Sequence, residues 1–250
     1  MELGIEGRTA LVMGASRGIG RGIAEALARE GARLALAART LEHLDAVAES
    51  LDAETATFSV DSRDLERLAE LPTAVGERLG PIDILVVNTG GPPPGGALET
   101  SEEQWLDAYR ELVLAPRTLV EATIAGMRER GWGRIVNVAS SSVREPIPGL
   151  ALSNAHRMAT VGLFKTLATE VAGDGVTLNT VGTGKFATDR LASLYGSLEA
   201  AEEHAVKDVP AGRLGTPAEY GDLVAFICSE RAAYLTGTVI PLDGGLLRSA

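Results

Sequence analysis

The sequence is poor in the residues that support several common functions. It contains one cysteine, Cys228, so no disulfide can form within the chain, and we expect a small buried side chain in a reducing compartment. Its three histidines, His43, His156 and His204, are far apart in the sequence and have no metal-ligand spacing. We therefore predict neither a disulfide framework nor a metal site.

Positive charge and long apolar runs are also scarce. The formal net charge is -11 and the pI is near 4.8, which disfavours nucleic acid as a partner because phosphate binding needs clustered positive charge. No run of about 18 apolar residues exists, and the opening residues are acidic where a signal peptide would be basic. These features predict a cytoplasmic protein with no membrane partner.

The chain is instead rich in glycine and in short apolar runs. These runs alternate with longer amphipathic segments and are mostly continuous, as in parallel strands covered on both faces. The expected strands are 8–14, 33–38, 56–60, 83–88, 134–140, 176–181 and 238–242. This alternation predicts one α/β domain over residues 1–250, a doubly wound Rossmann-type fold with a seven-stranded, mostly parallel sheet.

Local signals set the ends of the expected helices. Gly31 suits the C-terminal cap of a helix over 22–31. Ser101 and Gln104 have the spacing of a capping box at the start of a long helix over 101–131. Pro116 lies inside that helix and should kink or locally distort it.

The segment "GASRGIG" (14–20) joins the first strand to the first helix. Its glycines, Gly14, Gly18 and Gly20, allow a tight turn and a close approach of backbone to a pyrophosphate at a helix N-terminus. Glycine-rich loops also form ordinary turns, but this one follows a strand and opens a helix, the context of a dinucleotide site. We expect Ser16, Arg17 and Ile19 to bind the cofactor with the glycines.

The end of the second strand indicates which dinucleotide binds. An acidic residue there would bond the ribose hydroxyls of NAD, but the chain has Ala38 and Arg39. Together with Arg17, Arg39 suits a 2′-phosphate, unless both arginines are merely solvated. NADP(H) is therefore predicted, with NAD(H) as the alternative.

Seven segments together resemble the short-chain dehydrogenase/reductase family, in particular its 3-oxoacyl-acyl-carrier-protein reductases. They are "GASRGIG" (14–20), "VD" (60–61), "NTGG" (88–91), "GRIVNVASS" (133–141), "VTLNTVGTGKFAT" (176–188), "GRLGTPAE" (212–219) and "YLTGTVIPLDGG" (234–245). The resemblance covers essentially the whole chain. It implies reversible hydride transfer between a nicotinamide and a small-molecule carbonyl or alcohol.

The resemblance also implies positions for binding and assembly. Asp61 and Ser62 would lie near the adenine, Asn88 and Gly90 along the cofactor, and residues from Thr183 through Gly184 to Phe186 near the nicotinamide amide. Members of the family assemble as dimers or tetramers through two helices, which here are residues 101–131 and about 153–172.

The family's four polar catalytic residues are only partly present. The match of "RIVNVASSS" puts the family serine at Ser140, and the usual thirteen-residue step from it reaches Ser153 where the family has tyrosine. Four residues further, Arg157 replaces the family lysine, and Leu112 occupies the position of the asparagine. A serine hydroxyl ionises far less readily than a phenol, and arginine cannot relay a proton.

Other groups could supply the missing chemistry. Arg157 could bind the cofactor at its nicotinamide ribose, and Arg157 and Ser140 could polarise a carbonyl. Lys185, Tyr195 and His156 are weaker candidates, and for each a surface or packing role is the simpler interpretation. Residues 185–208 suit a substrate lid, and the proline-rich loop 90–96 suits either a rigid wall beside the nicotinamide or a plain connector.

Two functions remain open from the sequence. The first is an NADP(H)-dependent carbonyl reductase with an atypical active site. The second is an NADP(H)-binding sensor or partner subunit with little or no turnover.

Overall fold

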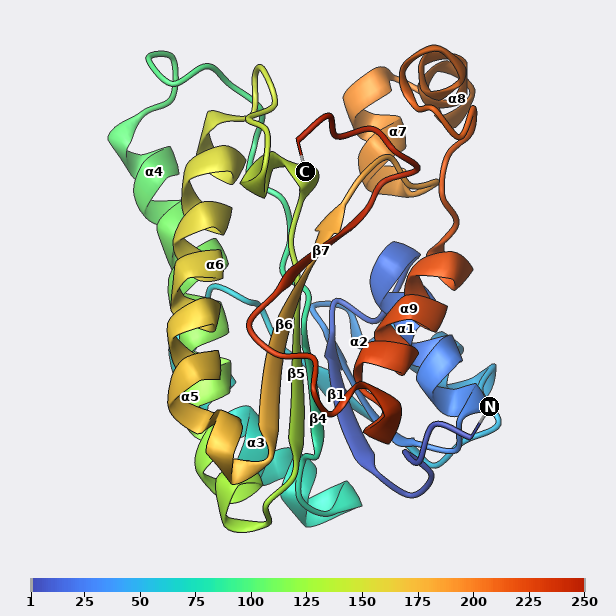
Figure 1. Cartoon of the computed structure of the whole chain (residues 1–250), viewed down its shortest axis with the longest axis vertical. Coiled ribbons are helices and arrows are strands. Elements are labelled where there is room, and N and C mark those ends of the chain that lie inside the picture. Colours follow the sequence, from blue (N-terminus) through green and yellow to red (C-terminus); the bar gives the residue numbers. More distant parts are fainter. Residues whose placement is uncertain (1, 250) are drawn as a thin grey trace.

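The computed structural model describes residues 2–249 as a seven-stranded sheet between two layers of helices (Figure 1). The strand order is β3-β2-β1-β4-β5-β6-β7, and every neighbouring pair is parallel. The strands are β1 Thr9–Met13, β2 Arg33–Ala38, β3 Thr55–Ser59, β4 Ile84–Val87, β5 Gly133–Val138, β6 Val176–Thr183 and β7 Val239–Leu242. The predicted fold class and the seven predicted strands are confirmed, with shifts of one to a few residues at their ends.

The helices follow the strands in the expected alternation. They are α1 Gly18–Arg29, α2 Leu41–Glu49, α3 Leu65–Leu79, α4 Glu102–Tyr109, α5 Ala115–Glu129, α6 Ala151–Val171, α7 Asp189–Tyr195, α8 Leu198–Asp208 and α9 Pro217–Ile227. Gly31 has a positive φ of 79° just beyond α1, and Ser101 and Gln104 form both bonds of the capping box on α4. Both cap predictions are therefore confirmed.

Successive residues of each central strand face opposite helical layers. On β1, Val12 packs with α1, α2 and α9, whereas Leu11 packs with α3, α5 and α6. On β4, Val86 and Leu85 divide in the same way. This alternation explains the continuous apolar runs in the sequence, because both faces of the sheet are buried.

Pro116 changes the long helix as predicted. A five-residue π-helical segment, η1 (Arg110–Leu114), separates α4 from α5, and Pro116 lies in the first turn of α5. Proline has no N–H to donate to the carbonyl of Leu112 four residues earlier. That carbonyl instead accepts a hydrogen bond from the Thr160 hydroxyl of α6.

The strand order reverses direction between β1 and β4. The loops after these two strands therefore open a crevice at the carboxyl edge of the sheet, where doubly wound folds bind their ligands. No helix among residues 2–249 combines the length and the apolar character needed to cross a membrane.

Candidate functional site

The loop after β1 forms a tight cradle at the start of α1. Gly14 and Gly18 have positive φ values of 63° and 54°. A Cβ on Gly20 would lie 2.1 Å from the carbonyl oxygen of Gly14, so no larger residue fits there. Asn88, at the end of β4, closes the other side, because its Nδ2 would lie 2.7 Å from a Cβ on Gly14. The sequence-predicted glycines and Asn88 are thus brought together.

The first turn of α1 leaves backbone donors free for an anion. Gly18, Ile19 and Gly20 open the helix, and the preceding Arg17 makes no side-chain cap. The Ile19 side chain packs against the core, so only its backbone can face a ligand. Ser16 lies in the turn itself. This cradle has the geometry that a pyrophosphate requires.

The two arginines expected at the 2′-phosphate have different surroundings. Arg39 is exposed, and its guanidinium has no hydrogen bond or ion pair within residues 2–249. Arg17 instead forms an ion pair of 3.2 Å with Asp189 of α7. Of the two, Arg39 is the freer to bind a phosphate.

Asp61 and Ser62 follow β3 beside this crevice. Asp61 forms an ion pair of 3.0 Å with Arg63, and this hydrogen-bonding partner holds the pKa of the Asp61 carboxyl below its usual value. The Ser62 hydroxyl donates to Oε1 of Glu111 at 3.2 Å. An adenine here would therefore meet two carboxylates, both already bonded to protein groups.

Ser140 is available as a hydrogen-bond donor. It lies just after β5 and is half-buried, and its Oγ accepts a bond of 3.1 Å from the backbone N–H of Ser142. The hydroxyl hydrogen is then free to be donated to a substrate oxygen. Ser153, in the first turn of α6, is only 8% exposed.

Arg157 bonds directly to the backbone at the edge of the sheet. Its Nη1 donates to the carbonyl of Val138 at 2.9 Å and its Nη2 to the carbonyl of Gly90 at 3.0 Å. Burial lowers the pKa of the Arg157 guanidinium. A lysine ammonium is a point charge and could not hold both carbonyls with the same fork, so Arg157 clamps the ends of β4 and β5 together.

The proline-rich loop is held against the start of α6. The N–H of Gly95 donates to the carbonyl of Gly149 at 2.7 Å, and the Gly95 carbonyl accepts from the N–H of Ala151 at 3.2 Å. Ala151 is the first residue of α6, so the loop supplies one of that helix's missing acceptors. This contact holds the loop in place and is consistent with both the wall and the plain connector.

The segment 185–208 folds as α7 and α8 over its own small apolar cluster, which includes Ala201 and Ala205. Lys185 forms an ion pair of 2.7 Å with Asp208, and its ammonium lies 5.4 Å from the centre of the Tyr195 ring. The hydrogen bond to Asp208 raises the pKa of Lys185 against the opposing effect of burial. Neither Lys185 nor Tyr195 bonds to Ser140, Ser153 or Arg157 in the described chain.

His156 is enclosed between two helices. Its Nδ1 lies 2.8 Å from the carbonyl of Leu152, and its ring lies 5.0 Å from that of Trp105 and 6.2 Å from that of Tyr109. These neighbours come from α4 and from α6 itself. A packing role accounts for them, and a catalytic role for His156 has no contact to support it.

Three residues near the predicted site were not expected from the sequence. Glu111 lies on η1, and its Oε1 would be 2.5 Å from a Cβ on Gly90. Arg190 of α7 donates to the carbonyl of Pro92 at 2.8 Å. The only indications in the sequence are that Glu111 adjoins Leu112 and that Arg190 lies within the segment 185–208.

Tyr220 of α9 is the third of these residues. It is fully buried, its hydroxyl lies 3.0 Å from the Thr183 hydroxyl, and burial raises the pKa of the phenol above its usual value. This bond fixes the end of β6. Gly184 follows there, and a Cβ on it would lie 2.5 Å from Cα of Asp243, so the chain passes close to the segment after β7.

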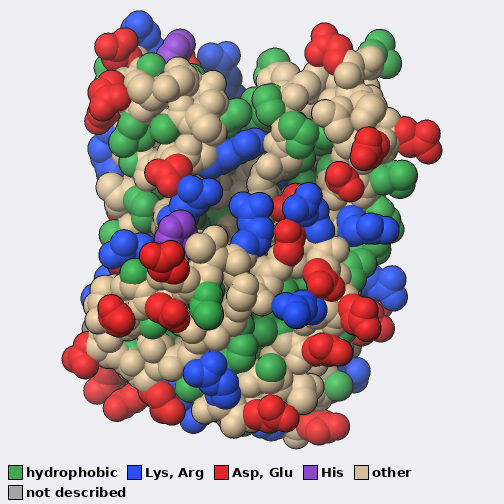
Figure 2. Space-filling view, turned by 180° about the vertical axis from the view of Figure 1, so that it is seen from behind, with side chains coloured by type: hydrophobic (Ala, Val, Ile, Leu, Met, Phe, Trp, Pro, Cys, Tyr) green, Lys and Arg blue, Asp and Glu red, His purple; other side chains and the backbone are tan. Residues whose placement is uncertain are grey.

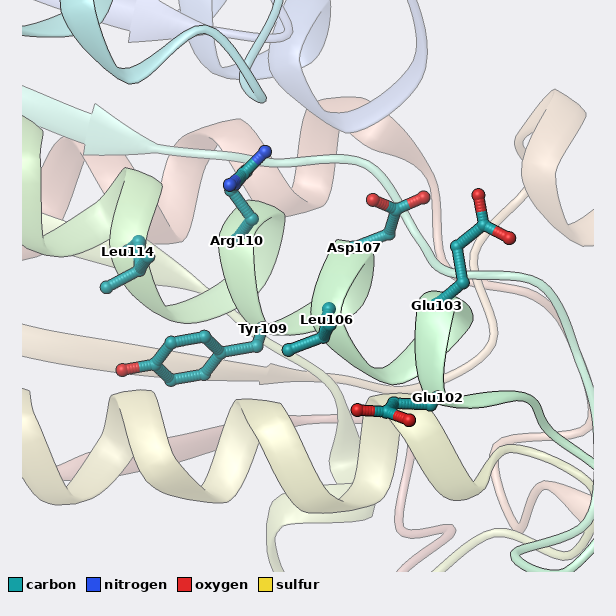
Figure 3. A pocket seen from close by; sticks show the side chains of 7 residues that line it. All are labelled: Glu102, Glu103, Leu106, Asp107, Tyr109, Arg110 and Leu114. Atoms are coloured by element: carbon teal, nitrogen blue, oxygen red, sulfur yellow. The ribbon is translucent and has the colours of Figure 1, made fainter.

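A separate groove lies on the outer side of α4 and η1 (Figure 3). It is lined by Glu102, Glu103, Leu106, Asp107, Tyr109, Arg110 and Leu114. In Figure 3, Leu106 and Tyr109 extend toward α6, whereas Asp107 and Arg110 point away from it. The groove does not include the glycine cradle or Arg157.

Known proteins resemble this chain over nearly its full length. The family model described as enoyl-(acyl carrier protein) reductase matches residues 14–247. The 3-oxoacyl-[acyl-carrier-protein] reductase FabG of Vibrio cholerae is 35% identical over 244 residues, covering 98% of this chain and 99% of the relative. Gluconate 5-dehydrogenase of Gluconobacter oxydans is 35% identical over 247 residues, covering 97% and 95%.

A solved structure also resembles this chain over its full length. The L-sorbose reductase of Gluconobacter frateurii, in complex with NADPH and L-sorbose, superposes with a TM-score of 0.95 at 31% identity and covers 100% of both chains.

Proposed function

This chain belongs to the short-chain dehydrogenase/reductase family, and on that basis we propose that it is an NADP(H)-dependent carbonyl reductase with an atypical active site. The observation that carries the proposal is the glycine cradle, in which Gly14, Gly20 and Asn88 leave no room for a side chain. A cradle of this kind serves a bound pyrophosphate. The relatives named above act on 3-oxoacyl groups, gluconate and sorbose, so a small carbonyl compound is the proposed substrate.

NADP(H) is the proposed cofactor and NAD(H) the alternative. Arg39 is exposed and unpaired at the end of β2, where a carboxylate would favour NAD(H), and the similar sorbose reductase was solved with NADPH. Arg17 would join Arg39 if its pair with Asp189 opens. Asp61 and Ser62 would border the adenine, and Thr183 and Gly184 the nicotinamide.

The bound nicotinamide would supply the hydride, and the chain's own groups would handle the oxygen. Reduction turns the carbonyl, one hydride and one proton into an alcohol. Ser140 would donate a hydrogen bond to the substrate oxygen, and Arg157 would stabilise the negative charge that develops there; the free hydroxyl hydrogen of Ser140 and the charge of Arg157 support these roles. The proton would come from Ser153 or from water, which is why we expect slow turnover.

Residues 185–208 are the proposed substrate lid. Arg190 reaches the carbonyl of Pro92, Arg17 pairs with Asp189, and Thr188 lies 3.4 Å from a Cβ on Gly18. The segment thus contacts both loops that border the crevice. A substrate bound over Ser140 would lie beneath it.

The second candidate is an NADP(H)-binding protein with little or no turnover. The two bonds of Arg157 to backbone carbonyls favour it. They give Arg157 a structural role that needs no substrate and no reaction. It is also favoured by Leu112, whose carbonyl is already bonded to Thr160. Both candidates require the glycine cradle.

One experiment separates the two candidates. NADPH is titrated by its fluorescence, and its oxidation is then followed with a panel of ketones, diketones, sugars and 3-oxoacyl thioesters. Turnover with any member of the panel supports the reductase. Tight NADPH binding without turnover supports the binding protein, and absence of NADPH binding refutes both.

A homodimer or homotetramer is proposed through α4 and α6. Leu106 is 60% exposed, Tyr109 43% and Met158 53%, and these apolar side chains belong to the two helices that the family uses for subunit contact. Figure 3 shows Leu106 and Tyr109 extending from α4 toward α6. Light scattering after gel filtration should show a dimer or larger for the wild type and a monomer for Leu106→Glu/Met158→Glu. The matched control Leu41→Glu, on exposed α2, should not change the mass.

A further inference from the structure

Two guanidinium groups flank the loop that follows β4. Arg157, from α6, donates to the carbonyl of Gly90 at 3.0 Å, and Arg190, from α7, donates to the carbonyl of Pro92 at 2.8 Å. The two anchor residues are separated by Gly91 alone and so lie at most about 7 Å apart along the chain. Gly91 itself lies against Arg190, whose Nε would be 3.0 Å from a Cβ there.

Both groups keep donors that the protein does not use. A guanidinium carries five N–H bonds. Arg157 uses two of them, for Val138 and Gly90, and Arg190 uses one, for Pro92. The remaining donors belong to two side chains that are both held at the loop after β4.

Neither arginine forms an ion pair with a carboxylate within residues 2–249. The two nearby acids are already engaged, since Asp189 pairs with Arg17 and Glu111 accepts from Ser62. Figure 2 shows several Lys and Arg side chains, with Asp and Glu side chains among them, around a hollow between the two upper lobes. The two arginines thus lie on a chain whose net charge is -11.

Arg157 has two charged neighbours of opposite sign, Glu111 and Arg190. Burial lowers the pKa of the Arg157 guanidinium most, the Glu111 charge raises it, and the Arg190 charge lowers it by a smaller effect. A bound carboxylate would offset the effect of Arg190 and accept from both guanidinium groups, the arrangement in which arginine binds most strongly. Neutral ketones or thioesters offer no such gain.

We propose that Arg157 and Arg190 form a carboxylate-binding site, so that the substrate is a free oxo acid or the corresponding hydroxy acid and not a neutral ketone or thioester. The inference rests on the proposed function for the carbonyl, but the binding of the carboxylate can be tested without turnover. Arg190 is the specificity-determining residue, because the lid brings it to a crevice that Arg157 already borders.

The test compares acids with their uncharged counterparts. Pyruvate, acetoacetate and levulinate, each beside its methyl ester, are titrated by calorimetry into the NADP⁺ complex, in which a carbonyl cannot be reduced, and into the free protein. A charge-assisted hydrogen bond predicts that at least one acid binds about 10- to 150-fold more tightly than its ester. Equal affinities, or no binding of any acid, would overturn the proposal.

Two variants test whether Arg190 contributes to the preference for the acid. Arg190→Met keeps the length of the side chain and removes the charge, so the preference should fall by about tenfold or more, leaving only the part that Arg157 contributes. Arg190→Lys should retain more of the preference. The matched control is Arg67→Met, because Arg67 is an exposed arginine of α3 that pairs only with Asp64, and it should retain all of the preference.

The remaining outcomes are also decisive. If Arg190→Met leaves the preference for the acid unchanged, the proposal is refuted. If it weakens NADP⁺ and leaves the preference intact, Arg190 serves the cofactor phosphates, and the proposal is refuted as well. If the acids bind selectively but no compound is ever reduced, the carboxylate site stands and the reductase function fails.

Discussion

A phenol and an ammonium can be returned to positions 153 and 157 by the double substitution Ser153→Tyr/Arg157→Lys. A correctly placed general acid contributes about 10²- to 10⁴-fold to a rate, so kcat/KM for carbonyl reduction should rise by a factor in that range. Ser140 keeps its free hydroxyl hydrogen in this variant, because its bond from the Ser142 N–H is untouched. The substitution therefore adds the acid and leaves the other donor in place.

The double substitution should also lower the free energy of unfolding. Lysine cannot span the carbonyls of Val138 and Gly90 that Arg157 bonds at 2.9 and 3.0 Å. Losing this fork should lower the free energy of unfolding by about 2–4 kcal/mol, since bonds to charged groups contribute about 1.5–3 kcal/mol each and water can replace part of them here. The free energy of unfolding of a domain of this size is about 5–15 kcal/mol, so the variant should stay folded.

The assay is NADPH oxidation with the ketone panel, run beside the matched variant Ser153→Phe/Arg157→Lys. The phenylalanine variant has the same ring and lacks only the hydroxyl. The increase in kcat/KM of the tyrosine variant should fall as pH rises through the phenol's pKa, because the ionised phenol cannot donate a proton. Equal rates for the two folded variants would refute the reasoning and leave Leu112 or the lid as the limiting feature.

Arg157→Met should lower the free energy of unfolding in urea by about 2–4 kcal/mol, and a loss below about 1 kcal/mol would show that water fully replaces the fork. Gly20→Ala should abolish NADPH binding measured by fluorescence, because its Cβ would lie 2.1 Å from a backbone oxygen, whereas Gly76→Ala, with nothing within 4 Å, should bind normally. Arg213 lowers the pKa of Glu219 to about 2 from 4.5, so this pair stabilises the fold above pH 4.5 and its contribution is lost as pH falls toward about 2. Urea unfolding across that range should show a weaker pH dependence for Glu219→Gln, and an unchanged dependence would contradict the assignment; the effect is small because the pair is exposed.

Much of the fold was predictable because its signals are local. Each strand needs only a short apolar run, the capping box needs Ser101 and Gln104 three residues apart, and Pro116 lacks one N–H wherever it lies. The glycine cradle is equally local, since Gly14 and Gly20 meet across a single turn. The sequence by itself therefore determined the architecture, and it predicts a dinucleotide site at the loop after β1. A count from Ser140 also predicts Ser153 and Arg157 at the positions of the family tyrosine and lysine.

The partners of the polar side chains were decided only by the tertiary structure. Arg157 could be placed on α6 from the sequence, but its bonds to Val138 and Gly90 depend on where two other strands end. Arg190 and Pro92 are 98 residues apart, and only the packing of the segment 185–208 over the crevice joins them. Hydrogen bonds act over about 3 Å, so no spacing along the chain can predict which distant groups will meet.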